Sequence, residues 1–174
     1  MTQPTQITFR AAQLTPLSSG ALWWREERML VVSDLHMGKS GRIARRGGTL
    51  LPPYDTGETL TRLEADIARH APRRVICLGD SFDDDLAMDE MDTLTRAQLG
   101  ALMAGRDWLW VEGNHDPGPV PLGGQSMAEV EIGGLTFRHI AQAETAPGEV
   151  SGHWHPKAGI TLRHRRVSSP CFLH

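Results

Sequence analysis

Residues that can bind metal ions follow the ends of short apolar runs in this sequence. Asp34 and His36 come after the run MLVV, Asp80 comes after RVICL, and Asn114 and His115 come after WLWV. Carboxylate oxygens, an amide carbonyl and imidazole nitrogens form a ligand set suited to Mn²⁺, Fe, Zn²⁺ or Ni²⁺. The pattern predicts a metal site if the fold brings these ends together.

Three further histidines belong to the same pattern. His139 ends the run LTFRHI, and His153 and His155 are one residue apart in the segment SGHWHP. Each residue alone has a simpler interpretation, because an aspartate after a strand often starts a turn or caps a helix, and a lone histidine is often a surface residue. Their joint occurrence at successive strand ends favours the metal site.

The elements that must position these residues are predicted to alternate in type. The apolar runs at 29–32, 74–78 and 108–111 predict buried strands. One helix is predicted from the capping box of Asp55 and Glu58 to Pro72, and another from Leu86 to Met103. Open α/β sheets place their sites at the carboxyl ends of such strands.

The two ends of the sequence are predicted to be rich in β-structure. ITFRAAQL, the turn TPLSSG and ALWW predict a hairpin at the start. From residue 128 onward, AEVEI, LTFRHI, EVSG, AGITLRH and RRVSSPCFL predict further strands, and GKSGRIARRGG predicts a loop or short helix. The predicted fold class is therefore α/β, with two sheets and helices outside them.

Composition limits the class of protein. A chain of 174 residues with 40% hydrophobic residues predicts a single globular domain, 1–174. The net charge of −3 argues against a strongly basic coat for nucleic acid. We expect a cytoplasmic protein, not a membrane protein, because the sequence has no apolar run of signal-peptide or membrane-spanning length. Cys77 and Cys171 are too few for a disulfide framework.

Five ordered motifs resemble those of the calcineurin-like metallophosphoesterases. They are Asp-Leu-His (34–36), Gly-Asp (79–80), Gly-Asn-His-Asp (113–116), His139 and Gly-His-Trp-His (152–155). Segments such as LLPPYDT, LGDSF and GHWHPKA make the sequence similar to the ligase-associated DNA damage response endonucleases in particular. The resemblance implies a four-layer α-β-β-α sandwich. Its C-terminal strands are expected to be shortened here, with a dimer as one way to complete the second sheet.

The resemblance also implies a role for each matching residue. Seven residues would hold two divalent metal ions, Mn²⁺ first among the candidates: Asp34, His36 and His155 on one ion, Asn114, His139 and His153 on the other, and Asp80 bridging both. His115 would face the substrate and protonate the leaving oxygen or stabilise charge on the phosphate. Asp116 would orient His115.

This ligand set predicts hydrolysis of phosphate esters. Two divalent ions about 3.5–4 Å apart activate water and polarise a phosphoryl oxygen. We expect a two-metal-dependent phosphodiester hydrolase, and the resemblance implies a DNA endonuclease or phosphodiesterase of DNA repair, with a DNA ligase and a helicase as partners. One alternative is a phosphoesterase for a small nucleotide or a phosphomonoester. Another is a catalytically inactive scaffold that binds metal.

Residues outside the motifs leave alternatives open. Asp83 stands where the family pattern has histidine, and its charge could repel a phosphate. Four basic residues follow the first motif and are candidate contacts to a nucleic-acid backbone, or else the charged face of a solvated loop: Lys39, Arg42, Arg45 and Arg46. Trp154 lies between two candidate ligands and could form a wall of the pocket.

Overall fold

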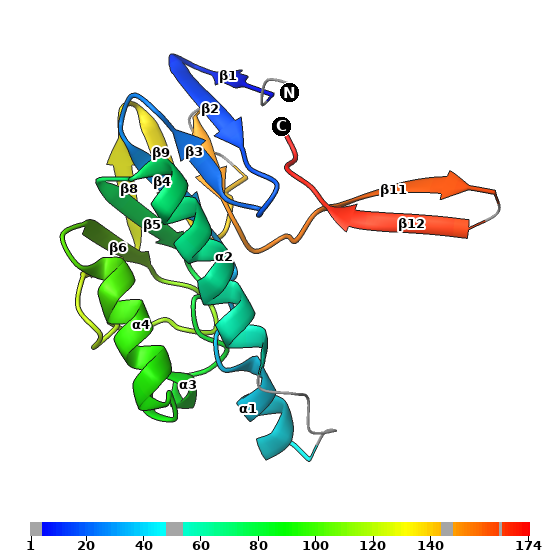
Figure 1. The fold of residues 1–174 in the computed structure, drawn as a ribbon. Helices are drawn as coiled ribbons and strands as arrows, with labels where there is room; N and C mark the ends of the chain where they lie inside the picture. The colour runs from blue at the N-terminus through cyan, green and yellow to red at the C-terminus, as the bar shows by residue number, and fades with distance from the viewer. Residues whose placement is uncertain (1–4, 48–53, 144–147, 164) are drawn as a thin grey trace.

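The protein has an α/β fold built around one large mixed sheet (Figure 1). The computed structural model describes residues 5–47, 54–143, 148–163 and 165–174, and only the backbone of residues 54, 55 and 162. Seven strands pair in chain order: β1 (Ile7–Phe9), β2 (Ala12–Pro16), β3 (Leu22–Trp24), β4 (Met29–Val32), β5 (Arg74–Leu78), β6 (Asp107–Val111) and β7 (Gln125–Met127). Neighbours from β1 to β4 are antiparallel, and neighbours from β4 to β7 are parallel.

The central strands β4, β5 and β6 are buried on both faces of the sheet. In β5, Val75 and Cys77 belong to the core on one face, whereas Ile76 and Leu78 belong to the core on the other. The same alternation runs through β4 and β6. Strands covered on both sides are expected to be apolar throughout, which is why the sequence shows them as unbroken runs.

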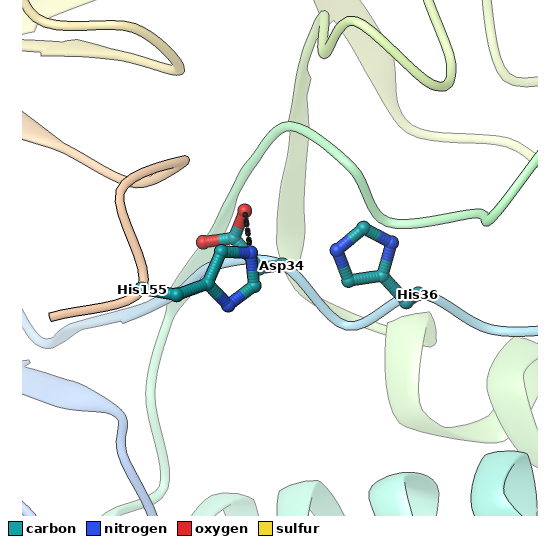
Figure 2. A group of neighbouring side chains, drawn as sticks. All are labelled: Asp34, His36 and His155. Atoms are coloured by element: carbon teal, nitrogen blue, oxygen red, sulfur yellow. Dashed lines mark ion pairs between the residues drawn. The ribbon is translucent and has the colours of Figure 1, made fainter. Parts of the chain in front are cut away.

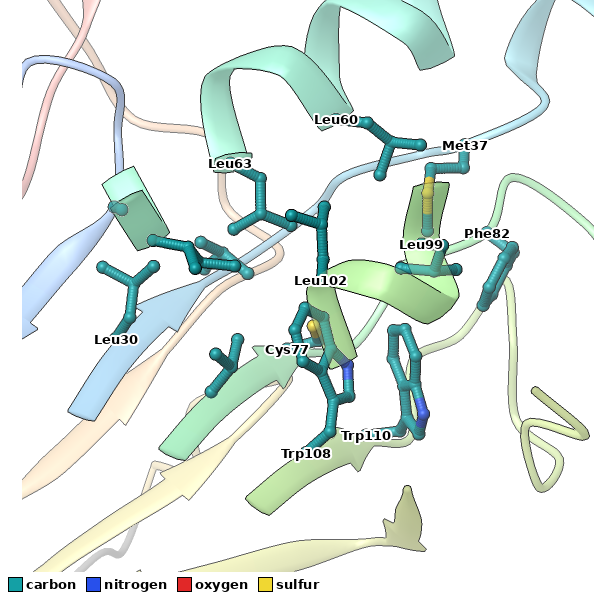
Figure 3. Packing of buried hydrophobic residues seen from close by; sticks show 14 of the residues in the cluster. Leu30, Met37, Leu60, Leu63, Cys77, Phe82, Leu99, Leu102, Trp108 and Trp110 are labelled. Carbon is teal, nitrogen blue, oxygen red and sulfur yellow. The ribbon is translucent and has the colours of Figure 1, made fainter. Parts of the chain in front are cut away.

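Among the described residues, four helices lie on the first face of the sheet: α1 (Lys39–Arg45), α2 (Tyr54–His70), α3 (Leu86–Asp89) and α4 (Thr93–Met103). Leu60 and Leu63 of α2 and Leu99 of α4 are buried in the core on this face. Figure 3 shows these leucines above Cys77 of β5 and the tryptophans of β6. α1 and α3 pack against each other beside α2, so the helices form one layer.

A second, three-stranded sheet covers the other face. It consists of β8 (Glu129–Ile132), β9 (Leu135–Arg138) and β10 (Glu149–Ser151), with β9 in the middle. Leu135 and Phe137 of β9 are fully buried in the core between the two sheets. In the described part of the chain all helices lie on the first face, so these residues form three layers. The fourth layer, a set of helices outside the second sheet, is not found among them.

The last two strands form a separate hairpin, which we call the arm. β11 (Lys157–Leu162) and β12 (Arg165–Pro170) pair with each other in an antiparallel register and join neither larger sheet. Figure 1 shows the arm projecting from the body of the molecule. Ile160 and Val167 lie opposite each other and are 60% and 48% exposed. The last two predicted strands therefore pair with each other and do not extend the second sheet.

The helix predicted from Leu86 to Met103 is interrupted in the structure. The carboxylate of Asp92 accepts the backbone N–H groups of Leu94 and Thr95 and starts α4 as its N-cap. Leu94, in the first turn of α4, is 82% exposed.

Two other predicted features can be placed only in part. The segment predicted as a loop or short helix contains α1. α2 begins at Tyr54, but the side chain of Asp55, and with it the predicted capping box, lies outside the described residues, as do residues 50–53 of LLPPYDT. Across the ranges that the structure describes, none of the helices combines the length and hydrophobicity that a membrane crossing requires.

Candidate metal centre

The loops that follow β4 and β5 run side by side beyond the sheet. The backbone N–H of Asp34 donates to the carbonyl of Gly79 at 3.2 Å, and that of His36 donates to the carbonyl of Asp80 at 2.9 Å. The backbone N–H of Met37 likewise donates to the carbonyl of Ser81 at 2.9 Å. The backbone therefore fixes the first two motifs relative to each other, at the carboxyl edge of the parallel strands.

Asp34, His36 and His155 form the first group of candidate ligands (Figure 2). One ligand atom from each residue lies within 4.8 Å of the others, and Nε2 of His155 is 3.4 Å from Oδ1 of Asp34. The hydroxyl of Ser33 donates to Oδ2 of Asp34. Burial lowers the pKa of His36 despite the nearby carboxylates, which favours the neutral imidazole that a metal requires.

Asp80, His139 and His153 form the second group, with Asn114 beside it. Nδ1 of His139 lies 2.8 Å from the carbonyl oxygen of Leu78, and a carbonyl only accepts hydrogen bonds, so Nδ1 carries the proton. In the neutral ring, Nε2 then has no hydrogen and carries a lone pair. It lies 3.0 Å from Oδ1 of Asn114 and 3.3 Å from Oδ2 of Asp80.

The second group therefore brings three electron-pair donors together at a buried point. His139 and Asp80 are each only 4% exposed, so water does not solvate them freely. Donors without a hydrogen between them repel one another, and a cation removes that repulsion. The carbonyl contact on Nδ1 also orients the ring in the way usual for metal-bound histidines. The chemistry of this donor set fits a divalent ion, as does that of the first group.

The segment from Gly152 to His155 connects the two groups. The backbone N–H of His153 donates to both oxygens of Asp34, at 3.2 and 3.1 Å, while the side chain of His153 belongs to the second group. The N–H of Gly152 donates to the carbonyl of His139 at 3.0 Å. A Cβ atom at Gly152 would overlap Oγ of Ser33 and lie 2.9 Å from Oδ2 of Asp34. Only glycine allows this approach.

Most of the candidate ligands have an unusual backbone conformation. Five of them have positive φ angles: Asp34 (53°), His36 (45°), Asp80 (48°), His153 (69°) and His155 (43°). This left-handed region is sparsely populated by residues other than glycine and costs free energy, so its clustering is typical of a functional site.

His115 lies against the first group, and its ring is held by a backbone group. Nδ1 of His115 is 2.8 Å from the carbonyl oxygen of Asp83, so this nitrogen carries the proton and Nε2 is left to interact with a substrate. The ring meets that of His36 edge to face, with 5.2 Å between the ring centres. The contact to this ring comes from the backbone of Asp83, and a role of Asp116 in orienting His115 stays a prediction.

Asp116 instead joins the loops that follow β5 and β6. Its buried carboxylate accepts four backbone N–H groups at 2.8 to 3.1 Å, from Asp80, Ser81, Phe82 and Gly113. Burial raises the pKa of Asp116, and these hydrogen bonds oppose that rise. At Gly113 a Cβ atom would overlap the backbone N of Asp80, so the two loops touch at this glycine.

The sequence did not reveal the position of Asp83. Its side chain is 1% exposed, with Oδ1 at 3.0 Å from Nδ1 of His36, although the angle does not suit a hydrogen bond. Oδ2 forms an ion pair with Nε of Arg42. The negative charge of Asp83, which could repel a phosphate if it were unpaired, is therefore balanced within the protein.

The basic residues near the first motif differ in their surroundings. Arg42 pairs with Asp83, and Arg45 pairs with Asp84 at 2.6 Å and with Glu90. Lys39 and Arg46 are exposed at the two ends of α1. Binding of a nucleic-acid backbone by these four residues stays a prediction. To contact a phosphate, Arg42 and Arg45 would have to leave their acidic partners or share them with it.

Comparisons with known proteins provide one informative similarity. No model of a protein family matches the sequence, and no curated protein sequence matches it. Among solved structures, the crystal structure of Pseudomonas putida nuclease MPE superimposes with a TM-score of 0.76 at 28% sequence identity. The match covers 98% of this chain and 81% of that one. The chain thus shares its fold with a nuclease.

Proposed function

We propose that the protein is a two-metal-dependent phosphodiester hydrolase that acts on nucleic acid. One observation carries the proposal. The two groups of candidate ligands lie at one edge of the sheet and are linked through Asp34 and the backbone of His153. The similarity to Pseudomonas putida nuclease MPE supports nucleic acid as the substrate.

In this proposal, each group of ligands holds one divalent ion. Asp34, His36 and His155 hold the first, and His139, His153 and Asn114 hold the second, with Asp80 shared between the two. When bound, the ions supply a nucleophile derived from water and stabilise charge on the phosphoryl group. His115 presents Nε2 to the substrate, where its protonated form donates a proton to the leaving oxygen.

Finer parts of the proposal rest on the sequence motifs. The chain forms a single domain of the calcineurin-like metallophosphoesterase type, uses Mn²⁺, and acts as a DNA endonuclease or phosphodiesterase in the cytoplasm. A role in DNA repair beside a DNA ligase and a helicase belongs to the same proposal. A ligase gene and a helicase gene beside the gene for this protein would support that role.

The experiment that tests the activity compares three substrates. Protein freed of metal and then reloaded with Mn²⁺ should hydrolyse single-stranded DNA and bis(p-nitrophenyl) phosphate, and should act weakly on p-nitrophenyl phosphate. A strong preference for the monoester would refute the nuclease assignment. Bound metal without turnover, with no further change in His115→Ala, would instead identify an inactive metal-binding protein.

Substitution of the shared ligand gives a sharper test. Asp80→Asn should lower diesterase activity by more than about 100-fold, because a direct ligand matters more than the residues that orient ligands. Asp85→Asn is the matched control, since this aspartate is exposed on the same loop. Lys39→Ala should have a smaller effect than Asp80→Asn. Comparable activity in Asp80→Asn and the control would show that Asp80 is not a shared ligand.

A further inference from the structure

One of the five tryptophans is set apart from the others by its exposure. Trp23, Trp24, Trp108 and Trp110 are between 1% and 8% exposed and belong to the two cores. Trp154 is 65% exposed. A large aromatic ring is usually buried because it has much apolar surface, and an exposed one suggests a surface where a ligand binds.

The position of Trp154 is fixed by its neighbours at the metal centre. It lies between the candidate ligands His153 and His155, and its backbone N–H donates to the carbonyl of Gly152 at 2.8 Å. Its ring meets that of His153 at 81°, with 5.1 Å between the ring centres. The ring of His153 in turn meets that of His139 at 77°. The indole is therefore held beside the ligands while most of its surface stays open to solvent.

The charge of the segment that follows Trp154 indicates which class of ligand is attracted to this part of the molecule. Residues 157–174 contain four basic residues and no acidic one: Lys157, Arg163, Arg165 and Arg166. The whole chain has a net charge of −3, so the preceding 156 residues carry −7. The arm is thus a basic segment on an otherwise acidic protein, and a polyanion is attracted to it.

We propose that Trp154 is a stacking platform for the nucleobase next to the phosphodiester that is cleaved. This inference rests on the proposed function, which brings a phosphodiester to the adjacent ligands. A base inside a duplex has both faces covered by its neighbours, so the platform accepts a base of a single strand. Stacking on an aromatic ring tolerates every base, and the site therefore recognises a strand and not a sequence.

A kinetic experiment separates stacking from metal binding. Trp154→Ala should lower kcat/KM for single-stranded DNA by about 5- to 150-fold, the equivalent of one stacked base, and Trp154→Phe should restore most of the loss. For a strand with the same phosphates in which abasic residues replace all the nucleosides, wild type and Trp154→Ala should be equal. An equal loss on both strands, or no loss on DNA, would overturn the proposal. Metal content, measured for each variant, is the control for damage to the neighbouring histidines.

Fluorescence tests the platform without turnover. Trp154 is the accessible tryptophan, so acrylamide should quench wild-type protein far more than Trp154→Ala. In EDTA, oligothymidylate should shield wild type from acrylamide, whereas the abasic strand should not. Equal shielding by both strands, or none, would refute stacking. Failure of wild type to cleave either strand would refute the proposed hydrolase, and the fluorescence result would still decide the role of Trp154.

Discussion

The carboxylate of Asp83 lies 3.0 Å from the imidazole of His36, on the side away from solvent. The same carboxylate pairs with Arg42 of α1, and the backbone carbonyl of Asp83 contacts Nδ1 of His115. One residue thus contacts a candidate ligand, a candidate catalytic histidine and a helix. It supports the site without needing to touch the substrate.

Removal of this carboxylate should weaken metal binding. Asp83→Ala leaves the guanidinium of Arg42 without its ion-pair partner and removes the carboxylate that lies 3.0 Å from Nδ1 of His36. We expect Mn²⁺ affinity to fall by about 10- to 100-fold, the usual effect of losing a residue that orients a ligand. Calorimetric titration measures it. Asp84→Ala is the control, because its ion pair with Arg45 lies at the surface and contributes little. Equal affinities in the two variants would refute this role.

A methyl group at Gly152 should disturb both groups of candidate ligands. In Gly152→Ala the added Cβ meets Ser33 and Asp34, so the segment that carries His153 and His155 must move away. We expect loss of bound metal from both groups, measured by elemental analysis, while circular dichroism stays unchanged. Gly57→Ala is the control, since a Cβ there has nothing within 4 Å. Full metal content in Gly152→Ala would contradict the close contact.

Asp116 should matter for stability even without metal. In the wild-type protein, four backbone N–H groups donate to the carboxylate of Asp116. In Asp116→Asn an amide NH₂, which cannot accept these hydrogen bonds, faces two of them. Each buried donor left unpaired costs about 1–3 kcal/mol, so we expect a loss of roughly 2–6 kcal/mol in the free energy of unfolding. Urea denaturation in EDTA measures it apart from metal binding. Asp89→Asn, at an exposed position, should change little. A similar small change for Asp116→Asn would be evidence against the four contacts.

The two cysteines should differ in reactivity. Cys77 is fully buried, and burial raises the pKa of its thiol well above the usual range, so the thiolate that reacts with disulfide reagents is not formed. Cys171 is partly exposed. Titration with Ellman's reagent should find one reactive thiol in native protein and two in denatured protein. Two fast-reacting thiols in native protein would show that the core opens readily around β5.

Much of the central fold could be predicted from the sequence because burial leaves a simple pattern there. β4, β5 and β6 are covered on both faces, so their residues form unbroken apolar runs, and the polar residues that end each run mark one edge of the sheet. The convergence of Asp34, Asp80 and Asn114 follows from the parallel order of these strands.

Features that depend on tertiary contacts could not be predicted in the same way. The burial of Asp83 depends on Arg42, which lies 41 residues earlier, and no local pattern reveals that pair. Asp116 follows His115 directly, yet its four partners lie on the backbone of two loops. The break before α4 depends on whether the Asp92 side chain bonds to the backbone, an outcome that apolar periodicity does not encode.

The contacts of Asp116 also bear on metal exchange. Because one carboxylate receives N–H groups from the ends of both β5 and β6, these two loops cannot shift independently. One ion should therefore replace another without local refolding. Selectivity would then come from the chemical nature of the ligands on a rigid template, and little from adaptation of the pocket to ionic size.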